Sequence, residues 1–262
     1  MSANNLVVTE FEAGVLTITL NHPKANAFNE EVIASTQAAF KNASRDPEVR
    51  CVLLTGKGKV FSAGQDVKEF GQSEDISFRA HLMRTYNPLV LQIRQLERPV
   101  LAAINGAVAG AALGVALACD LRIAADDARF FVGFLGIGLG LDSGVSLLLP
   151  SIIGLGRASE YAFTNQPISA KQALAWGLVN RLAPKDDLQD QAKAWATELA
   201  RGPVNAMGFA KRAFNKTVLR DLEGALDYEA HLQEIAGRGA DHKEGLQAFI
   251  EKRAPDYLRK NS

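Results

Sequence analysis

The sequence predicts an α/β protein in which a partly parallel sheet is followed by a region built mostly of helices. Two β-rich runs open the chain, and buried strands then alternate with helices as far as residue 104. The order strand, helix, strand, helix, strand favours parallel pairing, with the helices as crossovers. Beyond about residue 155 the pattern changes to helices. The chain is therefore expected to have a mixed core and a helical carboxyl-terminal part.

The first elements follow from local sequence signals. Residues 5–20 are predicted to form a hairpin, because two β-rich runs, LVVTEF and VLTITL, are separated by Ala13 and Gly14. Residues 29–45 are predicted to form a helix. Asn29 suits its N-cap, and two glutamates occupy the first turn, where the helix dipole favours negative charge.

The later elements are assigned in the same way. The apolar runs at 49–56 and 99–104 predict buried strands, and one long helix is expected between them at 77–97. A short apolar run, LVNRL at 178–182, interrupts the helical part, and the charged residues of 201–262 suggest exposed or intersubunit helices. The helices expected in this part cover 155–164, 169–176, 186–200, 203–217, 221–238 and 241–252.

The composition is that of an ordinary globular protein. The chain has 262 residues, 29 basic and 29 acidic, so its formal net charge is zero, and 47% of its residues are hydrophobic. A chain of this length can bury a stable core without disulfides or metals. The balanced charge favours neither a nucleic acid nor an anionic membrane as partner.

The cysteines and the apolar segments indicate in which compartment of the cell the protein is expected. Cys51 and Cys119 lie within apolar runs, so both are interpreted as core residues of a protein in the reducing cytoplasm. The amino terminus lacks the features of a secretory signal. Residues 99–119 carry no charge and could span a membrane, but their glycines and Asn105 favour a strand followed by a helix.

Asp142 is the most informative charged residue. It is the only charge between Phe130 and Gly156. A carboxylate in apolar surroundings has a raised pKa, which suits a general acid or base working near neutrality. Asp is also a preferred N-cap, and the segment after Asp142 is helical in pattern. Both interpretations are open at this point.

Other catalytic signatures are weaker. GKGK at 56–59 and GIGLG at 136–140 do not complete a phosphate-binding spacing. GLDSG at 140–144 resembles a nucleophile elbow with Asp in place of Ser, and His231 or His242 would follow in the right order, but the glycine-rich segment before it is a poor strand. The four histidines have no paired ligand spacing, so no metal site is predicted, and each is expected to be a surface or satisfied side chain: His22, His81, His231 and His242.

Four segments together resemble the crotonase (enoyl-CoA hydratase/isomerase) superfamily over essentially the whole chain. They are HPKANAFN at 22–29, VFSAGQD at 60–66, RPVLAAINGAVAGAALGVALACD at 98–120 and GLGRASEYAFTNQPISAKQALAWGLVNRL at 154–182. The resemblance implies a spiral of ββα turns over residues 1–200 that binds acyl-CoA, and a helical trimerisation region over 201–262. It also implies a homotrimer or a dimer of trimers, with no cofactor beyond the coenzyme A of the substrate.

The resemblance also implies the roles of individual residues. The backbone N–H groups of Gln65 and Ala111 would hold the thioester oxygen as it becomes enolate-like, a role that free amides at a helix N-terminus suit. The residues expected to contact coenzyme A are Lys24, Ala25, Ala63, Asp66, Lys68, Phe249 and Lys252, the last two from the same or a neighbouring subunit. The residues expected in the acyl pocket are Tyr86, Asn87, Gly110, Gly114 and Phe134.

Departures from the family pattern bear on the reaction. Hydratases of the family use two glutamates to handle water, and Gly114 and Phe134 occupy those positions. Asp142 matches the single carboxylate base of the isomerases, and one carboxylate is enough for a 1,3-proton shift. We therefore expect an acyl-CoA isomerase, and we expect that glutamates restored at both positions would raise hydratase activity.

The sequence is similar to more than one branch of the family. AGQD, YNPLV, LGLDSG and the carboxyl-terminal segment are most similar to the ring 1,2-epoxyphenylacetyl-CoA isomerases of phenylacetate catabolism. The 4-chlorobenzoyl-CoA dehalogenases share the aspartate position, but Asn87 and Phe134 replace their histidine and tryptophan. The sequence is also compatible with an enoyl-CoA hydratase of fatty acid metabolism, an Asp-dependent hydrolase and a non-catalytic CoA-binding relative.

Overall fold

The computed structural model describes residues 5–67 and 77–258, and these form two sheets covered by helices. The larger sheet has the order β1-β2-β3-β5-β7-β10, and the smaller has the order β4-β6-β8-β9. The larger sheet comprises β1 Val7–Glu12, β2 Val15–Leu20, β3 Cys51–Gly56, β5 Val100–Ile104, β7 Leu121–Ala125 and β10 Arg181–Ala183. The smaller comprises β4 Val60–Ser62, β6 Ala107–Ala109, β8 Arg129–Phe131 and β9 Ile168–Ser169.

The described helices are distributed along the whole chain. The earlier ones are α1 Glu30–Arg45, α3 Phe78–Arg84, α4 Tyr86–Gln95, α5 Ala111–Ala118, α6 Val145–Ile153, α7 Leu155–Thr164 and α8 Ala170–Ala175. The later ones are α9 Leu188–Arg201, α10 Val204–Thr217, α11 Leu222–Gly237 and α12 Ala240–Glu251, and two short 3₁₀ turns are η1 Leu135–Ile137 and η2 Lys185–Asp187.

The two sheets are built by a repeated unit of two strands and a helix. β3, β5 and β7 are neighbours in the larger sheet, and the short strands that follow them, β4, β6 and β8, are neighbours in the smaller one. All of these pairings are parallel. Each unit therefore advances the chain by one strand in both sheets. The spiral of ββα turns expected from the resemblance is confirmed, as is the partly parallel α/β class.

The hairpin at the start of the chain is also confirmed. β1 and β2 pair antiparallel from Val7 with Leu20 to Glu12 with Val15. Ala13 and Gly14 both have positive φ angles, 50° and 79°, as a two-residue turn between twisted strands requires. The helix predicted at 29–45 appears as α1, and the strands predicted at 49–56 and 99–104 appear as β3 and β5. Asn29 caps α1 by accepting from the Val32 N–H.

The prediction of one helix over 77–97 is wrong, because the segment breaks at Thr85 into α3 and α4. Thr85 has a non-helical φ and ψ of −111° and −84°. Pro88 cannot donate a backbone hydrogen bond to the carbonyl of Arg84. Gln37 satisfies the exposed carbonyls instead, since its Nε2 donates to Arg84 O at 3.3 Å and to Thr85 O at 2.6 Å.

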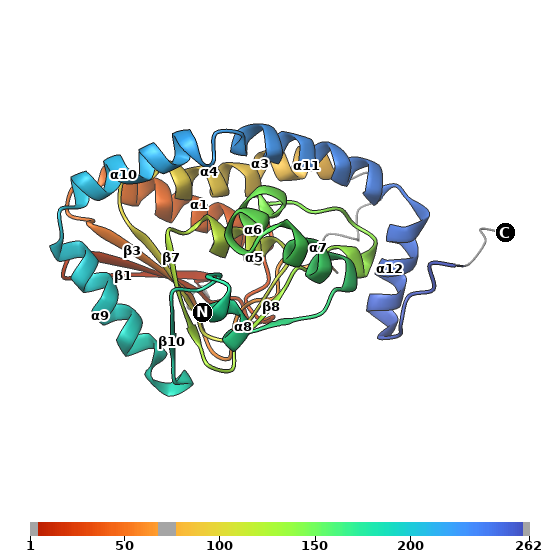
Figure 1. The fold of residues 1–262 in the computed structure, drawn as a ribbon, viewed down its shortest axis with the longest axis horizontal. Coiled ribbons are helices and arrows are strands. Elements are labelled where there is room, and N and C mark those ends of the chain that lie inside the picture. Colours follow the sequence, from red (N-terminus) through yellow and green to blue (C-terminus); the bar gives the residue numbers. More distant parts are fainter. Residues whose placement is uncertain (1–4, 68–76, 259–262) are drawn as a thin grey trace.

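Figure 1 shows the carboxyl-terminal helices α10 and α11 running along one side of the molecule above α1, α4 and α3. The six helices predicted after residue 155 appear as α7 to α12. The apolar run at 178–182 contributes β10, which pairs with β7 in parallel. α9 packs against β3, β5 and β7, and α11 packs against α3 and α6.

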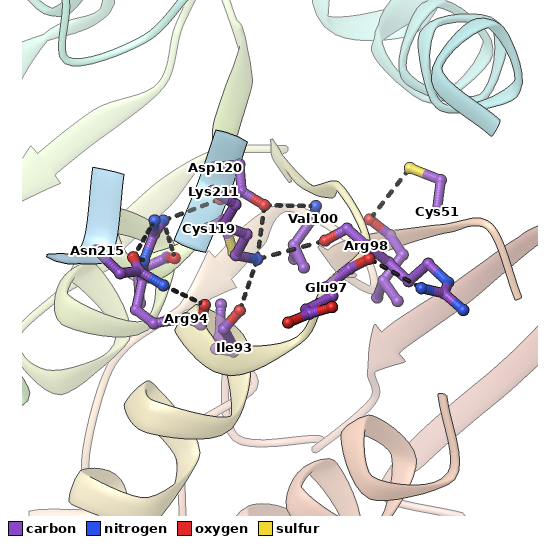
Figure 2. A network of polar contacts seen from close by, with 12 residues as sticks. Cys51, Ile93, Arg94, Glu97, Arg98, Val100, Cys119, Asp120, Lys211 and Asn215 are labelled. Atoms are coloured by element: carbon purple, nitrogen blue, oxygen red, sulfur yellow. Dashed lines mark hydrogen bonds and ion pairs between the residues drawn. The ribbon is translucent and has the colours of Figure 1, made fainter. Parts of the chain in front are cut away.

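A network of ion pairs and hydrogen bonds around Asp120 links α10 to the core (Figure 2). Asp120 accepts from Arg94 Nη1 at 2.9 Å through Oδ1, and from Lys211 Nζ at 2.8 Å through Oδ2. Asn215, also on α10, accepts from the Arg94 guanidinium. Burial lowers the pKa of Lys211, and Asp120 opposes that shift. The network thereby joins α4, α10 and the chain that enters β7.

The uncharged segment 99–119 folds as β5, β6 and α5 within the core. Among the described residues, no helix is both long and apolar enough to cross a membrane. Cys51 and Cys119 are free thiols buried in the core, which confirms that both are core residues. Burial raises the pKa of each thiol to about 12.

Candidate active site

A cleft of about 1170 Å³ lies where the smaller sheet meets α3, α4, α11 and α12. It brings together segments far apart in the sequence, from Lys24 to Phe249. Of the residues expected in the site, those that line it are Lys24, Ala63, Gln65, Asp66, Tyr86, Gly110, Ala111, Phe134, Asp142 and Phe249. Lys68 lies outside the described residues.

Two backbone N–H groups face the cleft without an acceptor in the described residues. Gln65 forms an isolated parallel bridge with Phe28, in which Phe28 bonds to Gly64 O and to Asp66 N, so the amide of Gln65 points to the opposite side. Ala111 is the first residue of α5, and its N–H has no intrahelical partner.

The two backbones also approach each other closely. Gly64 has a φ of +83°, and a β-carbon there would lie 2.6 Å from Ala109 O and 3.7 Å from Ala111 N. Only glycine fits this contact. The geometry can therefore present two convergent donors to one oxygen, as the resemblance implied for Gln65 and Ala111.

Asp142 is buried at the inner part of the cleft, with 8% of its surface exposed. Its Oδ1 accepts from Ser143 Oγ at 2.7 Å, and its Oδ2 accepts from Gln233 Nε2 at 2.8 Å. Burial raises the pKa of Asp142 to about 7, the two hydrogen bonds oppose that shift, and the charge of Glu229 adds to it. The carboxyl group can thus both accept and return a proton near neutrality.

Asp142 is not the cap of α6, so that interpretation is wrong. The N-cap is Gly144, and the N–H groups of Gly144 and Ser146 donate to Glu229, each at 2.8 Å. The nucleophile-elbow interpretation is also wrong. The segment before Asp142 forms η1 and a loop instead of the strand that an elbow requires.

Sequence reasoning missed Glu229 and Gln233, which support Asp142 from α11. They are four residues apart and therefore lie on one face of the helix. Both are buried, and Glu229 holds the start of α6 while Gln233 holds the carboxylate. Two polar residues at this spacing, in register with the apolar Leu222 and Leu226, were a signal that could have located them.

The side chain of Gln65 connects the segment that follows β4 to α3 and α4. Its Oε1 accepts from the Tyr86 hydroxyl at 2.7 Å and lies 3.2 Å from His81 Nε2. Burial lowers the pKa of His81 to about 4, so the ring is neutral at pH 7. His81 is therefore a buried, satisfied histidine in the cleft, as is His242, whose Nδ1 lies 2.8 Å from Ile137 O.

The residues expected to contact coenzyme A divide into two groups. Lys24 and Asp66 form an ion pair of 3.0 Å on the cleft wall, and Phe249 lines the cleft of its own chain. Ala25 and Lys252 are exposed and do not line the cleft, so the structure does not bring them to it. The cleft wall also includes the unpredicted cations Arg238 and Lys243. No group of residues in the described ranges could hold a metal ion.

Asn87 and Gly114, which were expected in the acyl pocket, do not line the cleft. Asn87 follows Tyr86 on α4, and its Nδ2 donates to Leu226 O at 3.1 Å. Gly114 packs against Ser143, since a β-carbon there would lie 2.5 Å from both the Cβ atom and the carbonyl oxygen of Ser143. A glutamate at Gly114 would require Ser143 to move, and whether restoring both glutamates raises hydratase activity stays a prediction.

This packing makes Gly114→Ala a sensitive probe of the site. The added methyl group must displace Ser143 and with it the turn that carries Asp142. We expect a loss of about 1 to 3 kcal/mol in the free energy of unfolding, the usual cost of overpacking. Turnover should fall while affinity for coenzyme A is retained. Urea unfolding and steady-state kinetics measure the two effects, and Gly224→Ala on the open surface of α11 is the matched control.

Comparison with known proteins identifies related sequences and structures. The profile of the Enoyl-CoA hydratase/isomerase family matches residues 10–260. The chain is 38% identical to the 1,2-epoxyphenylacetyl-CoA isomerase of Escherichia coli, covering 97% of this chain and 98% of that protein. It is 39% identical to a probable enoyl-CoA hydratase of Rhodobacter capsulatus, covering 95% and 96%. The crystal structure of an enoyl-CoA hydratase from Mycobacterium avium subsp. paratuberculosis superposes with a TM-score of 0.87 at 32% identity, covering 96% and 98%.

The fold and the cleft therefore define an acyl-CoA enzyme of the crotonase superfamily. Within it, the chain belongs to the enoyl-CoA hydratase/isomerase family.

Proposed function

We propose that this protein is an acyl-CoA isomerase that moves a proton along an enoyl-CoA thioester or rearranges a ring-epoxide phenylacetyl-CoA. The observation that carries the proposal is Asp142, a buried carboxyl group in the cleft whose pKa is raised to about 7. The only other carboxylate of the described cleft wall, Asp66, is paired with Lys24. No glutamate occupies either of the positions that hydratases use, Gly114 and Phe134.

In the proposed 1,3-proton shift, the Asp142 carboxylate removes a proton from one carbon of the acyl group. The negative charge passes to the thioester oxygen, where the N–H groups of Gln65 and Ala111 would stabilise it. One such donor is typically worth about 3 to 4 kcal/mol. Protonated Asp142 then returns the proton to another carbon, which restores the carboxylate. Phe131 and Phe134 supply an aromatic wall on the cleft, whereas Phe130 is buried in the core.

A hydratase is the second candidate, and one observation favours it. Oε1 of Gln233 is buried and has no hydrogen-bond partner among the described residues, beside a carboxylate of raised pKa. It could accept a hydrogen bond from a water molecule that Asp142 activates. The dehalogenase gains no such support, because Asn87, at the position of its histidine, does not line the cleft.

Kinetic measurements on the wild-type enzyme distinguish an isomerase from a hydratase. Its kcat/KM should be measured for hydration of crotonyl-CoA, for isomerisation of a 3-enoyl-CoA and for turnover of 1,2-epoxyphenylacetyl-CoA. We expect isomerisation of an enoyl or epoxide substrate to exceed hydration. Hydration near the rate of efficient enzymes, about 10⁷ per molar per second, would contradict the isomerase. Absence of turnover on all three would favour a non-catalytic CoA-binding protein.

We further propose that the chain assembles as a homotrimer or a dimer of trimers through its carboxyl-terminal region, residues 201–262. Large apolar side chains exposed on α10 and α11 support this: Phe209, Phe214, Tyr228 and Ile235. The same region also supplies Gln233 and Phe249 to the cleft, so assembly is not its only role. Light scattering after size-exclusion chromatography tests the subunit number.

The hydrogen bond from Gln233 to Asp142 predicts a shifted pH profile. Gln233→Leu removes a donor that stabilises the carboxylate, so the pKa of Asp142 should rise further, by about one unit for a hydrogen bond to a charged group. If Asp142 acts as the base, the rising limb of kcat/KM should move to higher pH by the same amount. Gln247→Leu, on exposed α12, is the control. An unchanged profile would show that Gln233 does not tune the carboxylate.

A further inference from the structure

The carboxamide of Gln65 is held in one orientation by two helices. Burial keeps the Tyr86 hydroxyl protonated by raising its pKa, so Tyr86 donates to Oε1 of Gln65 at 2.7 Å. The neutral ring of His81, in the tautomer with hydrogen on Nε2, donates to the same oxygen across 3.2 Å. Both lone pairs of Oε1 are therefore occupied.

The other half of the carboxamide is left as a donor. With Oε1 turned toward Tyr86 and His81, the nitrogen Nε2 lies on the opposite side of the group. None of the residues in 5–67 and 77–258 accepts a hydrogen bond from it, and Gln65 lines the cleft. Its two N–H groups are therefore available to a ligand that reaches this wall of the cleft.

The Nε2 atom of Gln65 lies close to the place where the acyl group of a bound thioester would begin. The same residue supplies a backbone N–H for the thioester oxygen, and with bonds of about 1.5 Å its Nε2 lies within about 6 Å of that N–H. Tyr86, at the other end of the carboxamide, is close enough to Asp142 for the charge of Asp142 to raise the pKa of its hydroxyl. Gln65 and Asp142 line the same cleft, so an acyl chain that leads from the thioester carbonyl to Asp142 would start beside Gln65.

We propose that Gln65 is a specificity-determining residue whose carboxamide donates a hydrogen bond to an oxygen atom on the β-carbon of the acyl group. The preferred substrates are then acyl-CoA thioesters that carry an epoxide, ether or keto oxygen at this carbon. This inference rests on the proposed binding of acyl-CoA in the cleft. A purely hydrocarbon chain would leave the donor unpaired, and sites built to bond a substrate atom discriminate strongly against analogues that lack it.

A matched pair of unreactive thioesters tests the proposal by binding alone. 3-Methoxypropanoyl-CoA and pentanoyl-CoA differ only in an oxygen atom in place of a methylene group. Isothermal titration calorimetry with the wild-type protein should give a dissociation constant about 10-fold lower for the ether. The ratio needs no turnover, so it stands whether or not isomerase activity is found.

Two substitutions then assign the preference to the carboxamide. Gln65→Met removes the donor and should abolish the ratio. Gln65→Glu keeps an acceptor for Tyr86 and His81 but replaces the N–H₂ group with an oxygen, so it should reverse the ratio. Equal wild-type affinities, or a ratio that persists in both variants, would overturn the proposal. Failure of both thioesters to bind would overturn it together with acyl-CoA binding in this cleft, whereas a correct ratio without isomerase turnover would refute only the proposed reaction.

Discussion

Asp142→Asn is expected to lower turnover of the isomerase substrate by roughly 100- to 10,000-fold, the range for loss of a general acid or base. Asparagine can still bond to Ser143 and Gln233, so affinity for the substrate should change little. In the wild-type enzyme, kcat/KM should rise with pH through about 7, because only the carboxylate can remove the first proton. The variant should lack this rise.

The stability of the same variant separates catalysis from structure. Burial raises the pKa of Asp142 from 3.8 to about 7, so between these values the folded protein holds a proton that the unfolded chain releases. The free energy of unfolding contributed by Asp142 therefore falls as pH rises through this window. Asparagine removes that dependence, and at pH 8 the variant should be at least as stable as the wild type.

Asp190→Asn on the exposed face of α9 is the control for Asp142→Asn. It makes the same chemical change far from the cleft and should alter neither turnover nor stability measurably. Steady-state kinetics and urea unfolding at pH 5 and pH 8 give all the required quantities. An unchanged turnover number in Asp142→Asn would exclude this carboxylate as the proton carrier.

Asp120→Ala should lower the free energy of unfolding more than the other substitutions proposed for this protein. Removing the carboxylate leaves Arg94 and Lys211 as buried cations without their shared partner, and the backbone N–H of Val100 loses its bond of 2.9 Å. Breaking a buried ion pair in this way typically costs about 3 to 5 kcal/mol. Urea unfolding of the variant measures the change directly.

Two further variants test the cause of that loss. Lys211→Met in the Asp120→Ala background removes one of the unpaired cations and should recover part of the lost stability. Asp127→Ala breaks an exposed pair with Lys185 and should cost no more than about 1 kcal/mol. A change of similar size for Asp120→Ala and Asp127→Ala would contradict the importance of the buried network.

Local sequence determined much of the fold. The hairpin at 5–20 and the helices after residue 155 were predicted because β-branched runs, turn residues and helical periodicity act within a few neighbouring residues. Asp142 could be found because it is an isolated charge within an apolar segment, where a carboxylate loses solvation and its pKa rises. The family could be recognised because four motifs occur in the right order, and the profile match confirmed it.

Other features depend on contacts between residues far apart in the sequence, and local sequence signals do not contain these contacts. The strands β4, β6 and β8 have three residues each, too few for a periodic pattern, and they form a sheet only by pairing with one another. The direction of Asn87 depends on α11, and the absence of space at Gly114 depends on Ser143.

The support of Asp142 comes from still farther along the chain. Gln233, which holds the carboxylate, is 91 residues away in sequence. Burial by the packed core, and not the identity of the residue, raises the pKa of Asp142 to about 7. The sequence by itself determined which carboxylate to consider, whereas the folded chain decided its protonation and its partners, because desolvation and hydrogen bonding depend on groups that only the fold brings together.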